Sequence, residues 1–149
     1  MTQPHDATSV LTLTPVIPVV TIDDAAHAVP LARVLLASGI NTIEITLRTP
    51  QALEAIARVA REVPESLPGA GTVLTAADLA AAAAAGAAFA VSPGATPALL
   101  AAAKAGSLPF LPGVASASEL MAAREAGFTA FKLFPAAQSG GVGFLKIDA

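Results

Sequence analysis

Short apolar runs rich in β-branched residues alternate along this chain with longer segments rich in alanine and leucine. Neighbouring parallel strands need a crossover connection, which is usually a helix, so this alternation predicts an α/β fold with a parallel sheet. No linker or shift in composition interrupts the pattern, which predicts a single domain over residues 1–149. The six predicted strands cover residues 16–20, 42–46, 66–72, 88–91, 108–111 and 129–134.

Helix start and stop signals stand between the predicted strands. Ser, Thr and Asp side chains cap the free N–H groups of a first helical turn, and glycine commonly follows a last turn. Pro97 also suits the first turn of a helix that begins after Thr96. The candidate N-caps are Asp23 or Asp24, Thr75, Thr96, and Ser116 or Ser118; the candidate stops are Gly39, Gly86, Gly106 and Gly127.

Two architectures accept six such βα units, an open doubly wound sheet and a TIM (β/α)8 barrel. A dinucleotide-binding doubly wound sheet carries a glycine-rich loop after its first strand, and residues 21–24 (TIDD) contain no glycine. Gly69 and Gly71 form a G-x-G without the last glycine of that fingerprint. The prolines and the arginine that follow the strands lie instead at carboxyl ends, where barrel enzymes build active sites. We therefore expect a TIM-barrel fold, with six of its eight units in this chain.

Composition excludes several functional classes. A net charge of −3 and a pI near 5.2 disfavour binding to nucleic acid. The absence of cysteine removes thiol chemistry, and His5 and His27 stand apart from other ligands, so we expect no metal site and no cofactor. Mean hydropathy is high at +0.69, yet no apolar run reaches the roughly 18 residues of a membrane span. Residues 1–6 do not resemble a signal peptide, and we expect a cytoplasmic protein.

Two charged residues stand in the middle of predicted strands. Side chains alternate between the faces of a strand, so Glu44 and Lys132 each lie on a polar face opposite apolar neighbours. Lys132 is the sole lysine in a predicted strand, since Lys104 and Lys146 fall near segment ends. The pair is either a buried structural ion pair or a catalytic pair. In the second case, the Lys132 amine attacks a carbonyl carbon to form a Schiff base, and Glu44 transfers protons.

Four further residues follow strand ends and have two interpretations each. Arg48, at the rim after Glu44, either clamps a substrate carboxylate through two parallel hydrogen bonds or is a solvated loop arginine. Thr72 and Pro93 are site residues or ordinary turn residues, and Phe134 lines a pocket or belongs to the core.

Five segments resemble the successive motifs of the bacterial 2-keto-3-deoxy-6-phosphogluconate (KDPG) aldolases, also called 4-hydroxy-2-oxoglutarate aldolases. Their order and spacing agree from about residue 14 to residue 146. The related 6-phosphogalactonate aldolases are less similar, because they tend to carry asparagine where this chain has Arg48. The segments are residues 44–49 (EITLRT), 69–74 (GAGTVL), 91–94 (VSPG), 111–114 (LPGV) and 131–136 (FKLFPA).

The resemblance implies a metal-independent class I aldolase on a (β/α)8 barrel, typically a homotrimer, that needs no cofactor. It implies cleavage of 2-dehydro-3-deoxy-6-phospho-D-gluconate to pyruvate and glyceraldehyde 3-phosphate, with 4-hydroxy-2-oxoglutarate as a further keto-acid substrate. The residue roles that it implies are a Schiff-base lysine at Lys132, a general acid/base at Glu44, substrate-carboxylate binding by Arg48 and Thr72, and pocket walls from Pro93 and Phe134.

The chain departs from the family pattern in two places. Pro68 lies inside the third predicted strand, where a proline removes a ladder hydrogen bond. Units seven and eight of a barrel, whose loops grip the substrate phosphate in the family, have no counterpart, and residues 147–149 no longer resemble it. A second hypothesis therefore stays open. The chain is a non-catalytic remnant or fragment that self-associates through exposed strand edges.

Overall fold

The structure, a computed structural model, describes residues 7–146. Its strands form a five-stranded sheet in the order β1-β2-β3-β4-β5 and a two-stranded sheet of β6 and β7, and every pair is parallel. The spatial order follows the sequence, as expected for successive βα units. The strands are β1 (Val19–Val20), β2 (Thr42–Thr46), β3 (Leu67–Gly71), β4 (Phe89–Val91), β5 (Phe110–Leu111), β6 (Gly113–Val114) and β7 (Lys132–Leu133).

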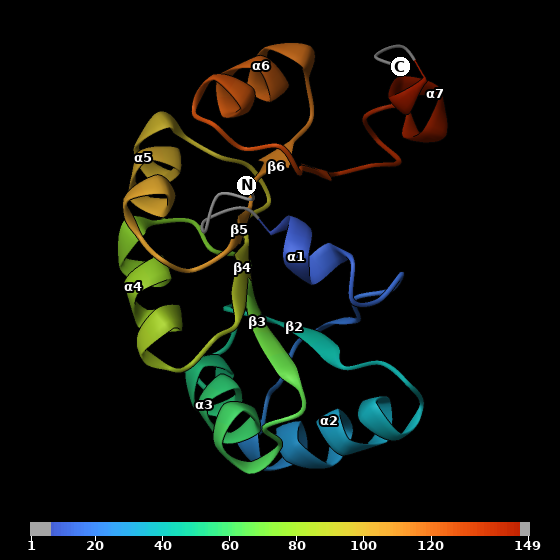
Figure 1. Cartoon of the computed structure of the whole chain (residues 1–149), viewed down its shortest axis with the longest axis vertical. Coiled ribbons are helices and arrows are strands. Elements are labelled where there is room, and N and C mark those ends of the chain that lie inside the picture. Colours follow the sequence, from blue (N-terminus) through green and yellow to red (C-terminus); the bar gives the residue numbers. More distant parts are fainter. Residues whose placement is uncertain (1–6, 147–149) are drawn as a thin grey trace.

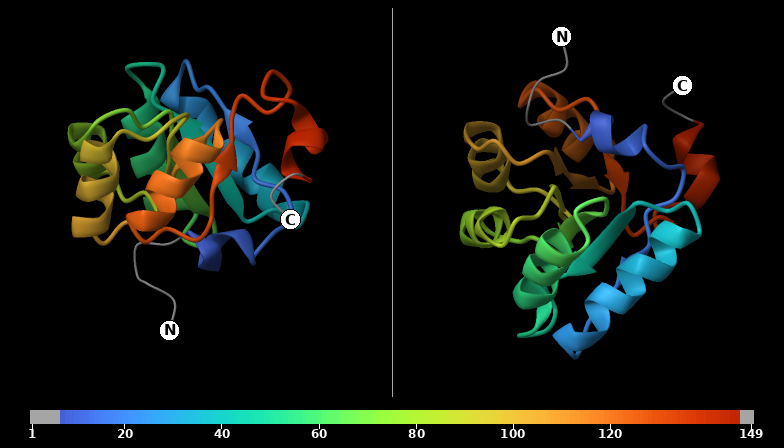
Figure 2. Two further views of the ribbon diagram at one scale, coloured as in Figure 1. Left: turned by 90° about the horizontal axis from the view of Figure 1, so that it is seen from above. Right: turned by 60° about the horizontal axis from the view of Figure 1, so that its bottom comes forward.

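Helices α2 to α6 lie in an arc outside the strands, whereas α1 lies on the inner side (Figures 1 and 2). The caps follow the sequence signals: Asp24 caps η1, Thr75 forms a capping box with Asp78, and Thr96 and Ser116 cap α5 and α6. The helical elements are α1 (Thr8–Leu11), the 3-10 helix η1 (Ala25–His27), α2 (Ala28–Ala37), α3 (Ala52–Glu62), α4 (Ala76–Ala84), α5 (Pro97–Ala105), α6 (Ala117–Glu125) and α7 (Gly141–Leu145).

The curved sheet separates two apolar cores. Ile43 and Ile45 of β2 belong to the large outer core beneath the helices. On the inner face, Ala7 and Val10 from the α1 segment pack with Phe89 and other strand residues, so α1 covers part of the barrel interior. The sequence did not predict this short helix, because only its tertiary contacts stabilise a segment of four residues.

Prolines account for the main differences from the predicted strands. The predicted fifth strand, 108–111, is shortened to β5, and β6, which the sequence did not predict, begins directly after Pro112, a residue with no N–H. Pro68 is accommodated inside β3 because pairing with β4 begins one residue later, at Gly69 and Phe89. Its carbonyl still accepts a hydrogen bond of 2.7 Å from the Ala88 N–H. The first and last strands are shorter than predicted, and β1 retains only the residues that pair with β2.

The sheet is open between β1 and β7. Within residues 7–146, β1 pairs with β2 and β7 pairs with β6, and no further strand joins their outer edges. Val16 and Val19 beside the β1 edge are more than half exposed. In the same part of the chain, no helix has the length and apolar character needed to cross a membrane.

Gly69 makes a specific prediction about packing. A Cβ at this position would overlap the Phe89 ring, so Gly69→Ala should lower the free energy of unfolding by about 1–3 kcal/mol. Gly94 is the matched control, because a Cβ there meets nothing within 4 Å. Gly94→Ala should change stability by less than about 0.5 kcal/mol. Urea unfolding of both variants measures the difference, and equal midpoints would contradict the packing argument.

Candidate active site

Glu44 occupies the middle of β2, whose residues are all buried. Its neighbours Ile43 and Ile45 face the outer core, so Glu44 faces the barrel interior with Thr42 and Thr46. Only 5% of its side chain is exposed. A carboxylate in this position requires a polar partner, because desolvating an unpaired charge costs several kcal/mol.

Lys132 of β7 provides that partner. Its Nζ donates a hydrogen bond of 3.4 Å to Glu44 Oε1, although the two residues are 88 positions apart. Ala130 packs with the inner core and Phe131 with the outer core, which agrees with the faces predicted from alternation. The Lys132 side chain is 26% exposed, so the pair lies at the boundary between the interior and solvent.

Glycine and phenylalanine shape the surroundings of this pair. A Cβ at Gly71 of β3 would overlap Glu44 Oε1, so a glycine is needed there for the carboxylate to fit. On the lysine side, Nζ lies 5.2 Å from the centre of the Phe134 ring, within the range of a cation–π contact. Phe134 is therefore beside the amine and 37% exposed, and it does not belong to the core.

Burial raises the pKa of the Glu44 carboxyl above its ordinary value. The attraction of Lys132, the hydrogen bond from Lys132 and the charge of Arg48 all act in the opposite direction, and they do not cancel the effect of desolvation. Arg48 itself is exposed two residues beyond β2. Its charge thus reaches the carboxylate from the rim.

Thr72 and Pro93 lie at the same carboxyl edge, one residue beyond β3 and two residues beyond β4, respectively. Thr72, after β3, has a positive φ of 57°, a conformation that non-glycine residues adopt at a small energetic cost and mostly at special sites. Pro93 is half-buried, and its carbonyl lies against Gly113. Lys132 contacts both Glu44 and Phe134, and the charge of Arg48 acts on the Glu44 carboxyl. Thr72 and Pro93 are grouped with these residues only because they lie at the same carboxyl edge of the sheet.

Comparisons with known proteins show the family of this chain. The family model described as KDPG and KHG aldolase matches residues 7–148. The chain belongs to this aldolase family. It is 49% identical over 143 residues to the KHG/KDPG aldolase of Escherichia coli K12, covering 96% of this chain and 67% of that protein. It is 51% identical over 132 residues to the 2-dehydro-3-deoxy-phosphogluconate aldolase of Pseudoalteromonas atlantica, covering 89% of this chain and 61% of that protein.

Solved structures of aldolases superpose closely on the chain. A crystal structure of KDPG aldolase from Legionella pneumophila, with pyruvate captured at low pH as a covalent carbinolamine intermediate, matches with a TM-score of 0.92 and 46% identity. The match covers 99% of this chain and 70% of that one. The predicted α/β fold of the TIM-barrel type is confirmed. The chain spans 61% and 67% of the lengths of the two curated relatives named above.

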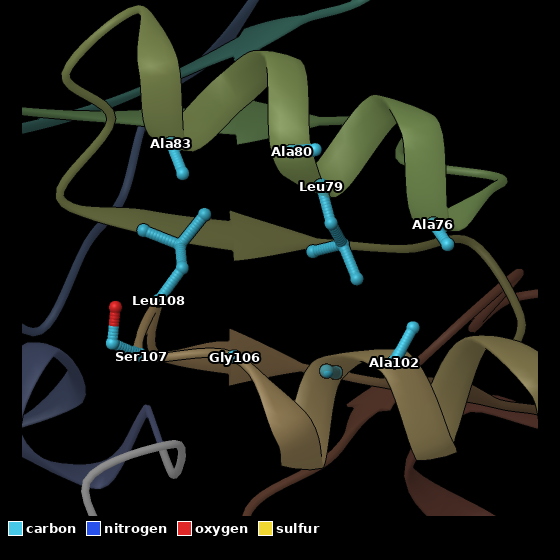
Figure 3. A pocket seen from close by; sticks show the side chains of 9 residues that line it. Ala76, Leu79, Ala80, Ala83, Ala102, Gly106, Ser107 and Leu108 are labelled. Atoms are coloured by element: carbon cyan, nitrogen blue, oxygen red, sulfur yellow. The ribbon is translucent and has the colours of Figure 1, made fainter.

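Two other grooves within residues 7–146 of this aldolase-family chain are lined mainly by apolar side chains. The groove in Figure 3 has a volume of about 250 Å³ and lies between α4 and α5, where Leu79 and Leu108 project into it and Ser107 is the polar contributor. A second groove of about 220 Å³, beside β7 and α7, is lined mainly by apolar side chains such as Phe131 and Phe144. Across residues 7–146, no three His, Cys, Asp or Glu side chains gather in a metal-binding arrangement.

Sequence reasoning missed two residues that shape the site. Gly71 belongs to an incomplete dinucleotide fingerprint and to the segment 69–74, and neither pattern assigns it a role, although a glycine inside a strand is itself a signal of close approach. Ser92 belongs to the segment 91–94 without an assigned role, yet it is fully buried and its hydroxyl accepts a hydrogen bond from the Gly113 N–H. A polar residue directly after a buried apolar strand was the available signal.

The raised pKa of Glu44 predicts how stability depends on pH. Between the ordinary pKa of 4.5 and the higher folded-state pKa, the folded chain binds more protons than the unfolded chain. The contribution of Glu44 to stability is therefore greatest below pH 4.5 and is lost as the pH rises through the folded-state pKa. Glu44→Gln stays neutral, so its unfolding free energy should gain relative to that of the unsubstituted chain as the pH rises. Urea unfolding from pH 4 to pH 8 measures this difference, and a constant difference would contradict the assigned direction.

Proposed function

We propose that this chain carries the Schiff-base machinery of a class I aldolase that cleaves 2-dehydro-3-deoxy-6-phosphogluconate to pyruvate and glyceraldehyde 3-phosphate. The contact between buried Glu44 and Lys132 is the observation that carries the proposal. It pairs an amine able to attack a carbonyl carbon with a carboxyl able to exchange protons. The relative from Legionella pneumophila, in which pyruvate is held as a carbinolamine, supports the same chemistry.

Lys132 acts as the nucleophile in the proposed mechanism. Its ammonium first loses a proton, and the free amine attacks the keto carbon of the substrate to form a C–N bond, while the carbonyl oxygen takes up a proton. The resulting carbinolamine expels water and becomes an iminium ion. Glu44 next accepts the proton of the hydroxyl on the β carbon, the second carbon from the iminium. The bond between the α and β carbons then breaks and sends its electron pair into the iminium, which releases the aldehyde and leaves an enamine. Protonation of the enamine and hydrolysis release pyruvate and restore the amine.

Glu44 transfers the protons in this cycle. Its Oε1 receives the proton from the Lys132 amine and returns it to the hydroxyl that departs as water. A general acid/base works best when its pKa lies near the operating pH. The burial that raises the pKa of Glu44 therefore moves this carboxyl toward a useful range.

The rim residues bind and enclose the substrate in the proposed mechanism. Arg48, exposed after β2, holds the substrate carboxylate through two parallel hydrogen bonds, and Thr72 contributes its hydroxyl. Pro93 and Phe134 form apolar walls. The Phe134 ring stands 5.2 Å from the reacting nitrogen, close enough to limit the access of water.

The assembly and location of the protein are also part of the proposal. The family resemblance supports a homotrimer in the cytoplasm, with the described βα units belonging to one barrel domain. A small keto acid is the partner that the family membership favours. Relatives of about 50% identity named as aldolases favour this interpretation over a non-catalytic remnant.

Covalent trapping tests the assignment of Lys132. Pyruvate followed by borohydride should leave a reduced adduct on Lys132, because a secondary amine formed from the imine is stable to digestion and mass mapping. Lys132→Met should abolish the adduct. Lys104→Met, near the end of α5, is the matched control and should retain it. An adduct on Lys104 or Lys146 in place of Lys132 would contradict the proposal.

The mechanism also predicts that chelators leave turnover unchanged. Lys132 supplies the electron sink as an iminium, and Glu44 supplies the proton transfer, so no step requires a Lewis acid. Aldol cleavage measured by pyruvate release should proceed at the same rate, within experimental error, before and after dialysis against EDTA. Loss of turnover that a divalent ion restores would contradict the mechanism.

A further inference from the structure

Within residues 7–146, the strand that carries Lys132 pairs with a single neighbouring strand. The Lys132 strand, β7, pairs with β6, and β6 belongs to a sheet separate from the one that contains Glu44. Pro112 stands between β5 and β6 and cannot donate a main-chain hydrogen bond. The alignment of Lys132 with Glu44 therefore depends on how β6 is held where the ladder is interrupted.

Ser92 provides a hydrogen bond at this interruption. It is fully buried directly after β4, and its backbone N–H donates to the Leu111 carbonyl over 3.2 Å. The next donor along the neighbouring chain segment is Gly113, and its N–H donates to Ser92 Oγ over 3.2 Å. A side-chain oxygen thus accepts the first hydrogen bond offered beyond the proline. If it were removed, a buried N–H would lose its partner, which is costly in a protein interior.

Gly113 links the segment held by Ser92 to the strand that carries Lys132. It is the register partner of Lys132, whose own N–H donates to the Pro112 carbonyl over 2.9 Å. On the other side, Gly113 lies so close to the Pro93 carbonyl that a Cβ would overlap it. The segment that carries Gly113 therefore lies between β7 and the two residues that follow β4, Ser92 and Pro93.

We propose that Ser92 is a positioning residue that holds Lys132 in register with Glu44, an inference that rests on the proposed Schiff-base function. This role requires no direct contact of the Ser92 side chain with Lys132 or Glu44. The Lys132 Nζ to Glu44 Oε1 distance of 3.4 Å is already at the long end for a hydrogen bond, so a small displacement of β6 breaks it. A displacement of about 1 Å can cost about 100-fold in rate.

Ser92→Ala tests the proposal, with Ser66→Ala as the matched control. Ser66 is also buried and also uses its hydroxyl, which donates to the Asn41 carbonyl over 3.5 Å. It precedes β3 and so lies at the opposite, amino end of the sheet. Both variants lose one buried hydroxyl, but only Ser92→Ala loses the acceptor for Gly113.

Two measurements distinguish positioning from a loss of stability. The first is the maximal rate of borohydride trapping at saturating pyruvate, together with the half-saturating pyruvate concentration. We expect Ser92→Ala to lower the maximal rate by about 10- to 100-fold with little change in half-saturation, and Ser66→Ala to leave both unchanged. The second is amide hydrogen exchange, in which the Gly113 and Lys132 amides should lose protection in Ser92→Ala while the β2 amides keep theirs.

Each outcome supports or overturns the proposal. Unchanged trapping and unchanged Gly113 protection in folded Ser92→Ala would overturn it, as would equal losses in both variants. If the unsubstituted chain itself forms no adduct on Lys132, the proposed function fails, and the hydrogen-exchange result alone decides whether Ser92 holds β6. Should Ser92→Ala fail to fold, Ser92→Cys fills similar space with a weaker acceptor, and the same selective loss of protection is expected.

Discussion

The burial of the Glu44 carboxylate inside the barrel is the constraint on which the rest of the site depends. An ionised carboxylate with 5% exposure requires an opposite charge, and Lys132 reaches it from a strand 88 residues later. The intervening βα units must therefore curve enough to bring β7 back toward β2. Gly71 is needed for the same reason, because any side chain there would occupy the space of the carboxylate.

The geometry of the pair favours the proposed catalytic role over a purely structural one. A structural ion pair gains most when it is short, desolvated on both sides and surrounded by further hydrogen bonds. Here the contact is 3.4 Å long, and the lysine is 26% exposed. The pKa of Glu44 stays raised despite the nearby ammonium, which means that pairing does not fully repay the desolvation of the carboxylate. An arrangement that stabilises so weakly is better suited to exchanging a proton than to holding the fold together.

Local periodicity predicted every strand except β6 and also the faces on which the charged residues lie, whereas tertiary contacts determined the other features. The alternation around Glu44 and Lys132 was sufficient to place both on the inner face, and the helix caps at Thr75 and Thr96 were readable from the sequence. The polarity of Ser92 after a buried strand was readable from the sequence, but its hydrogen bond was not, because that bond depends on Pro112, twenty residues later between β5 and β6. The short helix α1 was missed for a similar reason, since contacts with the barrel interior stabilise it.

The two halves of the site differ in how firmly the fold holds them. Glu44 lies on β2, which pairs with β3 over five residues and with β1 on its other side. Lys132 lies on β7, which pairs with β6 over two residues, and β6 follows a proline that interrupts the ladder. Since local stability follows the density of buried contacts, the lysine side should open at a lower free energy than the carboxylate side. The Lys132 amine then loses its alignment with Glu44 before the sheet unfolds. We therefore expect the hydrogen bond between Ser92 and Gly113 to affect the reaction rate more than the free energy of global unfolding.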